Sequence, residues 1–380
     1  MGTGLLFKVK NGNSINFRRG ELIMNNQRLY LDIHAIQTLP PSNVNRDDSG
    51  SPKTAQYGGV QRARVSSQAW KRAMRAYFQE HSSVNLGVRT KRIVNYVAEQ
   101  IQKADPSVNE TKAMEMAEAV LNAAGIKTDK DKAAKALFFL GKKQAESLAS
   151  AALRGEKDRK ILKDCLNDNP EIDIALFGRM VADDPSLNED ASAQVAHAIS
   201  THAVQTEFDY YTAMDDMSPE DQAGAGMLGT IEYNSETLYR YADVAVHELV
   251  HQLGSRETAV EALKLFVEAF SNSMPTGKMN TFANTTLPQA IMVNVRTDRP
   301  VSLVSAYEKP VRSNNGYVEE SVKRLFDELG KAEKFVDKPV LTFYVSQVDL
   351  AEKPEGKEEP SLKALIDDLG QIESWMQEES

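Results

Sequence analysis

"VQRARVSSQAWKRAMR", residues 60–75, joins two patterns that predict different secondary structures. The first six residues alternate between apolar and polar side chains, which is typical of a half-buried β-strand. Ser66 and Ser67 then stand where serine caps the free amides at the beginning of a helix. The helix is expected to continue through "QAWKRAMRAYFQE". The stretch therefore predicts a strand that leads directly into a helix.

The same two patterns recur along the chain. "LYLDIHAIQTL" (29–39) alternates as a strand, and residues 88–167 form a block with apolar residues at the three- and four-residue spacing of amphipathic helices. "EIDIALFGRM" (171–180) is expected to form a strand and "DASAQVAHAIS" (190–200) a short helix. The remaining expected elements are a long hairpin at 201–246, a helix at 256–273, a strand in "QAIMVNVRTD", a helix at 317–333 and a strand in "VLTFYVSQVD".

This order of elements predicts an α+β fold. Strands and helices alternate around one sheet, and a helical insert interrupts them. We expect a split β-α-β core with helices on one face of the sheet and two large excursions from it.

The composition is that of an ordinary globular protein, with 380 residues, 41% hydrophobic residues and 26% charged residues. Cys165 is its single cysteine, so an intrachain disulfide or a cysteine-based zinc site is excluded. The reducing cytoplasm is therefore the expected location. No apolar run approaches the roughly 18 residues of a membrane span, so we expect a soluble protein with no membrane partner.

The net charge of -9 conceals a segregation of charge along the chain. Residues 1–100 contain 15 Lys and Arg against 6 Asp and Glu, whereas the rest of the chain contains 30 against 48. Local basic surface attracts phosphates whatever the average charge of the protein. A nucleic-acid-binding surface is therefore expected in the N-terminal quarter.

The basic residues of this quarter are spaced so that they share faces of the predicted elements. Two arginines lie two residues apart on the predicted strand, and Lys71 and Arg75 lie four apart on the predicted helix. The free N–H groups and the positive dipole end at the start of that helix attract an anion. A solvated basic face paired with acids elsewhere is the alternative, and Asp47-Asp48 is expected to cap a turn and not to bind metal. The candidate phosphate-binding residues are Arg46, Lys53, Arg62, Arg64, Ser66, Gln68, Lys71, Arg72 and Arg75.

"HELVHQLGSRE" (247–257) comes within one residue of a zinc-metallopeptidase signature. In such an enzyme His247 and His251 would bind zinc from one helix, and Glu248 would act as the general base. The preceding segment "LYRYADVAV" alternates as a strand, however, and leaves room for only a short helix. Glu257 stands where the signature has His or Asp, and an acid there suits the start of the next helix. We therefore keep the zinc metallopeptidase as the alternative function and predict no metal site.

The basic quarter resembles the CasC (Cas-seven-type) backbone subunits of type I-E CRISPR Cascade complexes. Their motifs are similar to "PPSNVNRDD" (40–48) and "GGVQRARVSSQAWKRAMR" (58–75). The similarity extends in order and with similar spacing from about Gln27 to Val348. Further matching segments are "DIALFGRM", "AHAISTH", "DYYTAMDD", "LGTIEYNSETLYRYA" and "MVNVRTDRP".

The resemblance implies an α+β fold shaped like a right hand. It consists of an RRM-like (ferredoxin-like) palm, an inserted helical fingers domain and a β-hairpin thumb. In this sequence the palm would comprise 27–79, 171–199 and 236–350, the fingers 80–170 and the thumb 200–235, with an N-terminal extension at 1–26 and a charged C-terminal tail at 351–380.

Two interpretations of the N-terminal extension stay open. "RRGE" at 18–21 can be encoded by purine-only codons, as in a ribosome-binding site a few codons before Met24. Met24 would then be the native start. In the other interpretation residues 1–23 are a short extension of the protein.

The resemblance also implies roles for particular residues. Met180 matches a position that splays bases, and Tyr210 and Tyr211 match thumb aromatics near a displaced nucleotide. Aromatic stacking accepts any base; packing within the hairpin is the alternative for the two tyrosines. No catalytic residue, metal or cofactor is implied. The phosphate-binding residues implied by the family are Arg46, Lys53, Ser66, Gln68, Lys71 and Arg75, which the charge pattern also selects.

The implied function is that of a scaffold and not of an enzyme. Copies of the chain would assemble as a filament along guide RNA (crRNA) in antiviral defence and bind its backbone without sequence preference. The guide bases would then pair with target DNA. Other Cascade subunits and a recruited nuclease-helicase, to which cleavage belongs, would be the remaining partners.

Overall fold

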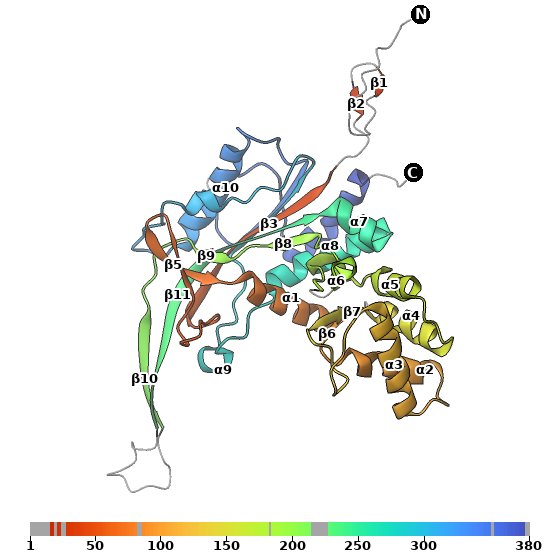
Figure 1. Ribbon diagram of the computed structural model, residues 1–380. Helices are drawn as coiled ribbons and strands as arrows, with labels where there is room; N and C mark the ends of the chain where they lie inside the picture. The colour runs from red at the N-terminus through yellow and green to blue at the C-terminus, as the bar shows by residue number, and fades with distance from the viewer. Residues whose placement is uncertain are drawn as a thin grey trace, which may run out of the picture.

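The computed structural model describes residues 16–18, 21–23, 28–81, 86–181, 184–213, 227–350 and 353–376 (Figure 1). Within the expected extension at 1–26, two short strands, β1 (Asn16–Arg18) and β2 (Glu21–Ile23), pair antiparallel with each other. Met24, the hypothetical start, lies outside the described residues.

The described residues form a ten-stranded sheet. Eight strands follow the order β14-β13-β12-β3-β11-β9-β5-β4, and β8 and β10 also pair with β11. The "LYLDIHAIQTL" segment is β3, which lies between β11 and β12 and runs antiparallel to both. The strands are β3 (Tyr30–Ser42), β4 (Thr54–Tyr57), β5 (Val60–Val65), β8 (Ala193–Val195), β9 (Ala198–Ser200), β10 (Glu207–Ala213), β11 (Met227–Ala245), β12 (Ala290–Arg296), β13 (Leu341–Ser346) and β14 (Lys357–Glu358).

The connection from β11 to β12 passes through two helices, α7 (Val246–Leu253) and α8 (Arg256–Asn272). Because β11 and β12 are both antiparallel to β3, they run parallel to each other with β3 between them. This is the split β-α-β arrangement expected from the sequence.

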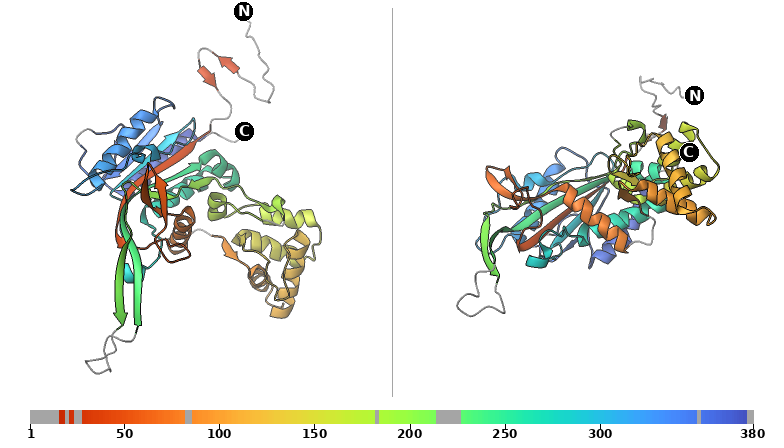
Figure 2. Two further views of the ribbon diagram at one scale, coloured as in Figure 1. Left: turned by 60° about the vertical axis from the view of Figure 1, so that its left-hand side comes forward. Right: turned by 60° about the horizontal axis from the view of Figure 1, so that its bottom comes forward.

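Helices cover both faces of the sheet, which corrects the expectation that they lie on one face only (Figures 1 and 2). On one face, Leu31 and Ile33 of β3 share a core with α7, α8 and α1 (Ser67–His81). On the other face, Ile36 of β3 and Tyr239 of β11 pack with α10 (Val318–Ala332) and a 3-10 turn, η3 (Val304–Tyr307).

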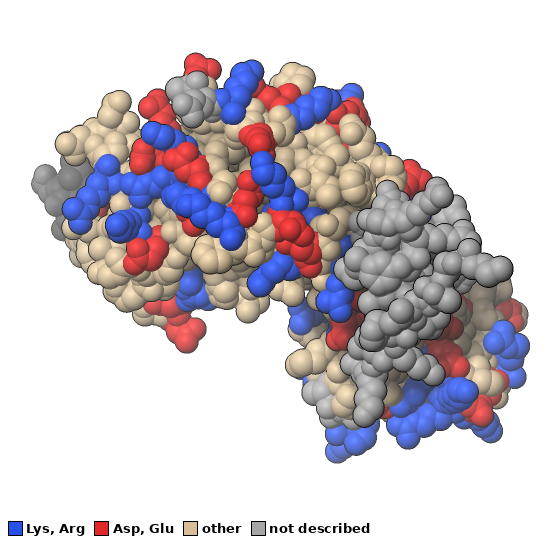
Figure 3. Space-filling view, turned by 90° about the horizontal axis from the view of Figure 1, so that it is seen from above, with Lys and Arg blue, Asp and Glu red and all other residues tan. Residues whose placement is uncertain are grey.

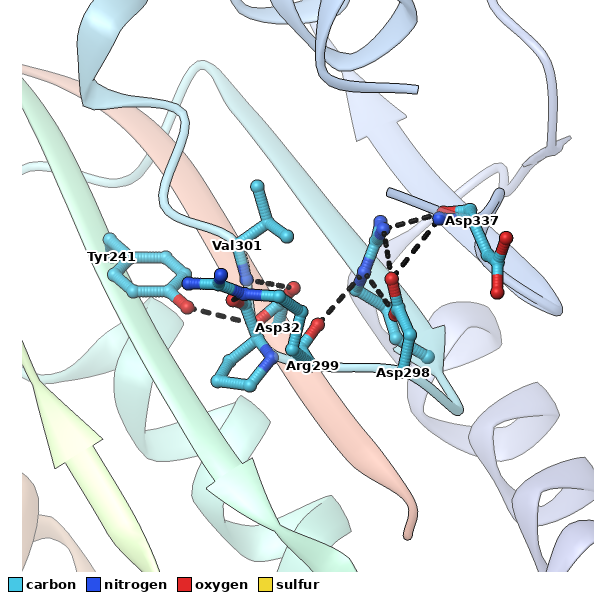
Figure 4. A network of polar contacts seen from close by, with 8 residues as sticks. Asp32, Tyr241, Asp298, Arg299, Val301 and Asp337 are labelled. Atoms are coloured by element: carbon cyan, nitrogen blue, oxygen red, sulfur yellow. Dashed lines mark hydrogen bonds and ion pairs between the residues drawn. The ribbon is translucent and has the colours of Figure 1, made fainter. Parts of the chain in front are cut away.

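The polar residues of β3 explain why the sequence predicted a half-buried strand with one face exposed to solvent. Asp32 is buried, and its carboxylate accepts hydrogen bonds from the Tyr241 hydroxyl at 2.8 Å and the Val301 N–H at 3.0 Å (Figure 4). Burial raises the pKa of Asp32 to about 7. His34 lies 3.0 Å from the Tyr239 hydroxyl and is also buried. These side chains find partners inside the protein, so the alternation in β3 marks two buried faces.

The helical block at 88–167 has a hydrophobic core of its own, beside the sheet (Figure 2). Ile93, Val97, Leu121 and Leu148 are fully buried in it. The three-residue strand β7 lies inside the segment expected to be wholly helical. The block consists of β6 (Val88–Thr90), α2 (Ile93–Ala104), α3 (Glu110–Ala124), β7 (Phe138–Leu140), α4 (Lys142–Leu153) and α5 (Arg159–Asn167).

Two predicted elements are wrong. "EIDIALFGRM" folds as a helix, α6 (Ile172–Phe177), because Ile172, Ala175 and Leu176 share one buried face; a short apolar run does not distinguish strand from helix. "DASAQVAHAIS" forms β8 and β9, which pair with β11. Here tertiary pairing overrides the local preference of an alanine-rich segment.

The C-terminal segment expected as a charged tail packs against the protein. Its amphipathic helix, α11 (Leu362–Asp368), and the following 3-10 turn η4 (Leu369–Trp375) contact α8. Leu365, Leu369 and Ile372 are fully buried, so this segment closes the core on the α8 face. Of the helices in the described residues, none is long and apolar enough to cross a membrane.

Candidate nucleic-acid interface

Helix α1 is fixed on the sheet by its apolar face. Trp70, Met74 and Phe78 are buried, whereas Arg72 on the opposite flank is exposed. The predicted cap is formed: the Ser66 hydroxyl accepts the N–H of Ala69 at 3.4 Å. Packing and capping together hold the basic flank of α1 outward.

A groove lies between α1 and the helical block, with a volume of about 1080 Å³. We call it the Met180 groove. Lys71, Arg72 and Arg75 line it from α1, and Arg89 of β6 and Met180 line it from the other elements. Two acids, Glu189 and Asp190, also line this groove.

A second groove, of about 1270 Å³, lies on the other flank of α1. We call it the Lys278 groove. Arg46 and Ser66 line it on one side, and the connection from α8 to β12 lines it on the other through residues 272–279. Gln68 and Arg72 line both grooves, which therefore adjoin along α1. Together the two adjoining grooves offer a continuous surface along α1, which suits an extended ligand.

Lys71 and Arg75 are half-buried in the Met180 groove and lie over aromatic rings. The Lys71 Nζ is 5.7 Å from the centre of the Phe177 ring, and the Arg75 Cζ is 4.3 Å from that of Phe139. Burial lowers the pKa of both side chains. Arg75 is also 3.7 Å from the carboxylate of Asp173. The rings hold both cations within the groove.

Met180 is the most exposed apolar side chain in the Met180 groove, with 82% of its surface accessible. Gly178 adopts a φ of +74°, which lets the chain turn after α6. Arg179 is buried and donates to the carbonyl oxygens of Leu187 at 2.9 Å and Leu166 at 2.8 Å. Arg179, which the sequence analysis did not select, thus anchors the turn that presents Met180.

Arg62 is not at the surface, which corrects its assignment as a phosphate-binding residue. Its side chain is fully buried. The guanidinium donates to the carbonyl oxygens of Tyr57 at 3.1 Å, Ser200 at 2.9 Å and Tyr307 at 2.8 Å. Arg62 therefore joins three segments of the sheet domain and has no face left for RNA.

Lys53, directly before β4, lies beside Arg64 of β5, whose N–H donates to the Lys53 carbonyl at 2.9 Å; both residues are outside the two grooves. The Arg64 Nε donates to the carbonyl of Thr54 at 3.1 Å, and its Nη1 is 3.2 Å from His197. Burial and the charges of Arg64 and Lys53 lower the pKa of His197. The two residues form a separate, partly exposed basic cluster, and their contact with phosphate stays a prediction.

The two hairpin tyrosines differ in exposure. Tyr210 is 64% exposed, on the same face of the hairpin as Phe208 and Leu228, which are also exposed. Tyr211 is paired with Gly229 and lies over it, since a Cβ at that glycine would meet the tyrosine oxygen at 2.4 Å. Tyr211 is itself 40% exposed, and the contact of Tyr210 and Tyr211 with bases stays a prediction.

Two contributors to the grooves were missed from the sequence. Arg89 lines the Met180 groove from β6, and Lys278 lines the second groove from a left-handed backbone position with a φ of 51°. Left-handed non-glycine residues are uncommon and cluster at ligand sites. A lysine directly after Pro275, Thr276 and Gly277 is the signal that could have drawn attention to this turn.

A family model described as CT1975-like protein matches residues 31–369. The chain belongs to the CT1975-like family. Two solved structures are similar to this CT1975-like protein. One, described as "CRISPR RNA-guided surveillance complex, pre-nicking", is 32% identical, covers 90% of this chain and 100% of its own, and has a TM-score of 0.78. Another, described as "CRISPR RNA-guided surveillance complex", is 29% identical over 90% and 99% of the two chains, with a TM-score of 0.69.

No curated protein matches the CT1975-like chain. The structural matches confirm the α+β class and the relationship to chains of CRISPR surveillance complexes that the motifs indicated. The type I-E subtype and the RRM-like description of the palm stay predictions.

His247 and His251 of the CT1975-like protein lie on α7, a short helix that follows the long strand β11. The Leu29 N–H donates to the His247 Nδ1 at 3.2 Å, and His251 is exposed. Glu257 accepts a hydrogen bond from the Ser255 hydroxyl at 2.7 Å at the start of α8. Throughout the described ranges, no three His, Cys, Asp or Glu residues gather as a metal site. No observation here favours the metallopeptidase alternative.

The face of the CT1975-like protein seen from above carries a mixture of charges. Lys and Arg side chains alternate there with Asp and Glu (Figure 3). On α10, for example, Arg324 pairs with Glu320 at 2.7 Å and Lys331 with Glu328 at 3.2 Å. Acids pair with the cations on this surface.

Proposed function

We propose that this CT1975-like protein is the CasC (Cas-seven-type) backbone subunit of a type I-E Cascade and binds guide RNA (crRNA) along its phosphates. The observation that carries the proposal is the pair of adjoining grooves along α1. The similarity of the chain to chains of CRISPR RNA-guided surveillance complexes also supports RNA as the ligand. Besides the buried Arg179, the cations that line the two grooves are Arg46, Lys71, Arg72, Arg75, Arg89 and Lys278.

The cations of α1 contact phosphates and not bases in this proposal. Lys71 and Arg75 are four residues apart on the helix, about 6 Å along its axis, so each reaches a different phosphate. Phosphate contacts position a nucleic acid but carry no sequence information. This suits a subunit that must accept any guide.

Apolar side chains provide the contacts to bases. Met180 projects into its groove beside the phosphate-binding residues, and Tyr210 projects from the hairpin that acts as the thumb. Both contact any base, because stacking and apolar packing depend little on base identity. The sheet domain acts as the RRM-like palm and the helical block as the fingers.

The proposed assembly is a filament of copies along one guide. The bases left accessible pair with target DNA, and other Cascade subunits complete the complex in the cytoplasm. Cleavage is carried out by a recruited nuclease-helicase, so this chain supplies no catalytic residue, metal or cofactor.

The proposal is tested by titrating two labelled single-stranded RNAs of equal length and unrelated sequence with the purified protein. The expected affinities agree within about twofold and fall steeply as salt rises. A preference of more than about tenfold for one sequence, typical of base-edge recognition, would contradict it. Binding that is insensitive to salt would also contradict it.

A further inference from the structure

A buried carboxylate lies where α1, α6 and the helical block meet. Asp173, on α6, is only 1% exposed. One of its oxygens accepts the N–H of Gly87 at 2.9 Å, directly before β6, where the helical block begins. The other oxygen is 3.7 Å from the Nε of Arg75 on α1. One carboxylate therefore contacts both the start of the block and a cation of the Met180 groove.

Arg75 is held from two sides and is still available to a ligand. Phe139 of β7 lies 4.3 Å under its guanidinium, and Asp173 faces its Nε. That Nε is buried and has no hydrogen-bond partner among the described residues, since 3.7 Å is too long for a hydrogen bond. Nε is the nitrogen nearest the carboxylate, so the two Nη groups are the ones left to a phosphate.

We propose that Asp173 is a positioning residue for RNA binding: its carboxylate orients Arg75 in the Met180 groove. Because the same carboxylate accepts the Gly87 N–H, it also couples the orientation of Arg75 to the position of the helical block. The inference rests on the proposed RNA-binding function and deepens it. Without the charge of Asp173, Arg75 still lies over the Phe139 ring, but its guanidinium has more than one orientation. Binding a phosphate then has to order the guanidinium, which costs binding free energy.

The charged state of Asp173 depends on its surroundings. Burial raises the pKa of Asp173 to about 6, while the Gly87 N–H and the charge of Arg75 act to lower it. The other titratable and charged groups that face this junction are Glu171 at the N-cap of α6, Arg89 of β6 and Tyr96 of α2. Near neutral pH the carboxylate is charged and orients Arg75; below about pH 6 it is protonated and this hold is lost.

The test is a double-mutant cycle on RNA affinity with Asp173→Asn, Arg75→Ala and the two combined. Asparagine keeps an oxygen for the Gly87 N–H and replaces the oxygen that faces Arg75 with an uncharged NH2 group, which does not attract the guanidinium. Glu171→Gln is the matched control, because Glu171 is a buried carboxyl at the N-cap of the same helix. Its carboxylate accepts the Lys143 N–H at 3.1 Å and does not contact Arg75. We expect D173N to weaken binding about fivefold near pH 7.5, and to have no further effect once Arg75 is alanine.

Measuring RNA affinity over a series of pH values tests the inference without a substitution at Asp173. The affinity ratio of the wild-type protein to R75A should narrow as pH falls through about 6, since Asp173 then no longer orients Arg75. A ratio that is constant between about pH 7.5 and pH 5.5 overturns the inference, as does an equal effect of D173N with and without Arg75. Failure of the wild-type protein to bind RNA instead refutes the proposed function, so the two failures are distinguishable.

Discussion

Replacing Lys71 and Arg75 together by alanine removes two of the cations that line the Met180 groove. Each cation that neutralises one phosphate of a single strand contributes about 0.7 to the slope of log affinity against log salt concentration. The double variant should therefore have a slope smaller in magnitude by about 1.4. If the electrostatic contribution vanishes near 1 M salt, the loss of affinity at about 0.1 M salt is about 25-fold.

The assay is fluorescence anisotropy of a short labelled RNA, repeated between about 50 and 400 mM salt. Lys323→Ala with Lys334→Ala is the matched control, because both lysines are exposed at or just after α10, on the other face of the sheet. It changes the net charge by the same amount. Equal affinities and equal salt slopes for the Lys71/Arg75 variant and the control would show that these two cations do not bind phosphate.

The remaining predictions concern single residues. Arg62→Ala should lower the free energy of unfolding by about 3 kcal/mol in a denaturant titration, because it leaves two buried carbonyls and one partly buried carbonyl without this donor. An unchanged midpoint would show that the guanidinium is not structural. Met180→Ala should leave stability within about 0.5 kcal/mol of wild type, since the side chain is 82% exposed. The variant should nevertheless give a smaller fluorescence change than the wild-type protein when it binds an RNA that carries 2-aminopurine. The same change for both proteins would show that Met180 does not contact the bases. Lys278→Ala should weaken RNA binding about fivefold and reduce the magnitude of the salt slope by about 0.7. A slope equal to that of wild type would exclude Lys278 from the phosphate-binding residues.

The strand-helix unit at 60–81 was predictable because its signals are local. Alternation, a serine cap and the four-residue spacing of Lys71 and Arg75 depend on near neighbours in the sequence. The structure adds that the two cations lie over aromatic rings of α6 and β7, and that Arg72 is shared by two grooves. Such contacts depend on segments that are about 60 to 200 residues apart in the chain.

Arg62 shows what the local signals missed. It has the same period-two position as Arg64 on β5, yet its guanidinium reaches carbonyls of Ser200 and Tyr307 far along the chain. The polar residues of β3 are a second case, since Asp32 is buried against Tyr241. A charged residue at a strand position does not reveal whether it faces water or a buried partner.

The most direct test of the central claim is to isolate the protein from the cells in which it naturally occurs and to analyse what co-purifies. We expect RNA of one discrete length, with several copies of this chain and other protein subunits on each molecule. Protein that carries no RNA, or single copies on RNA of random length, would contradict it.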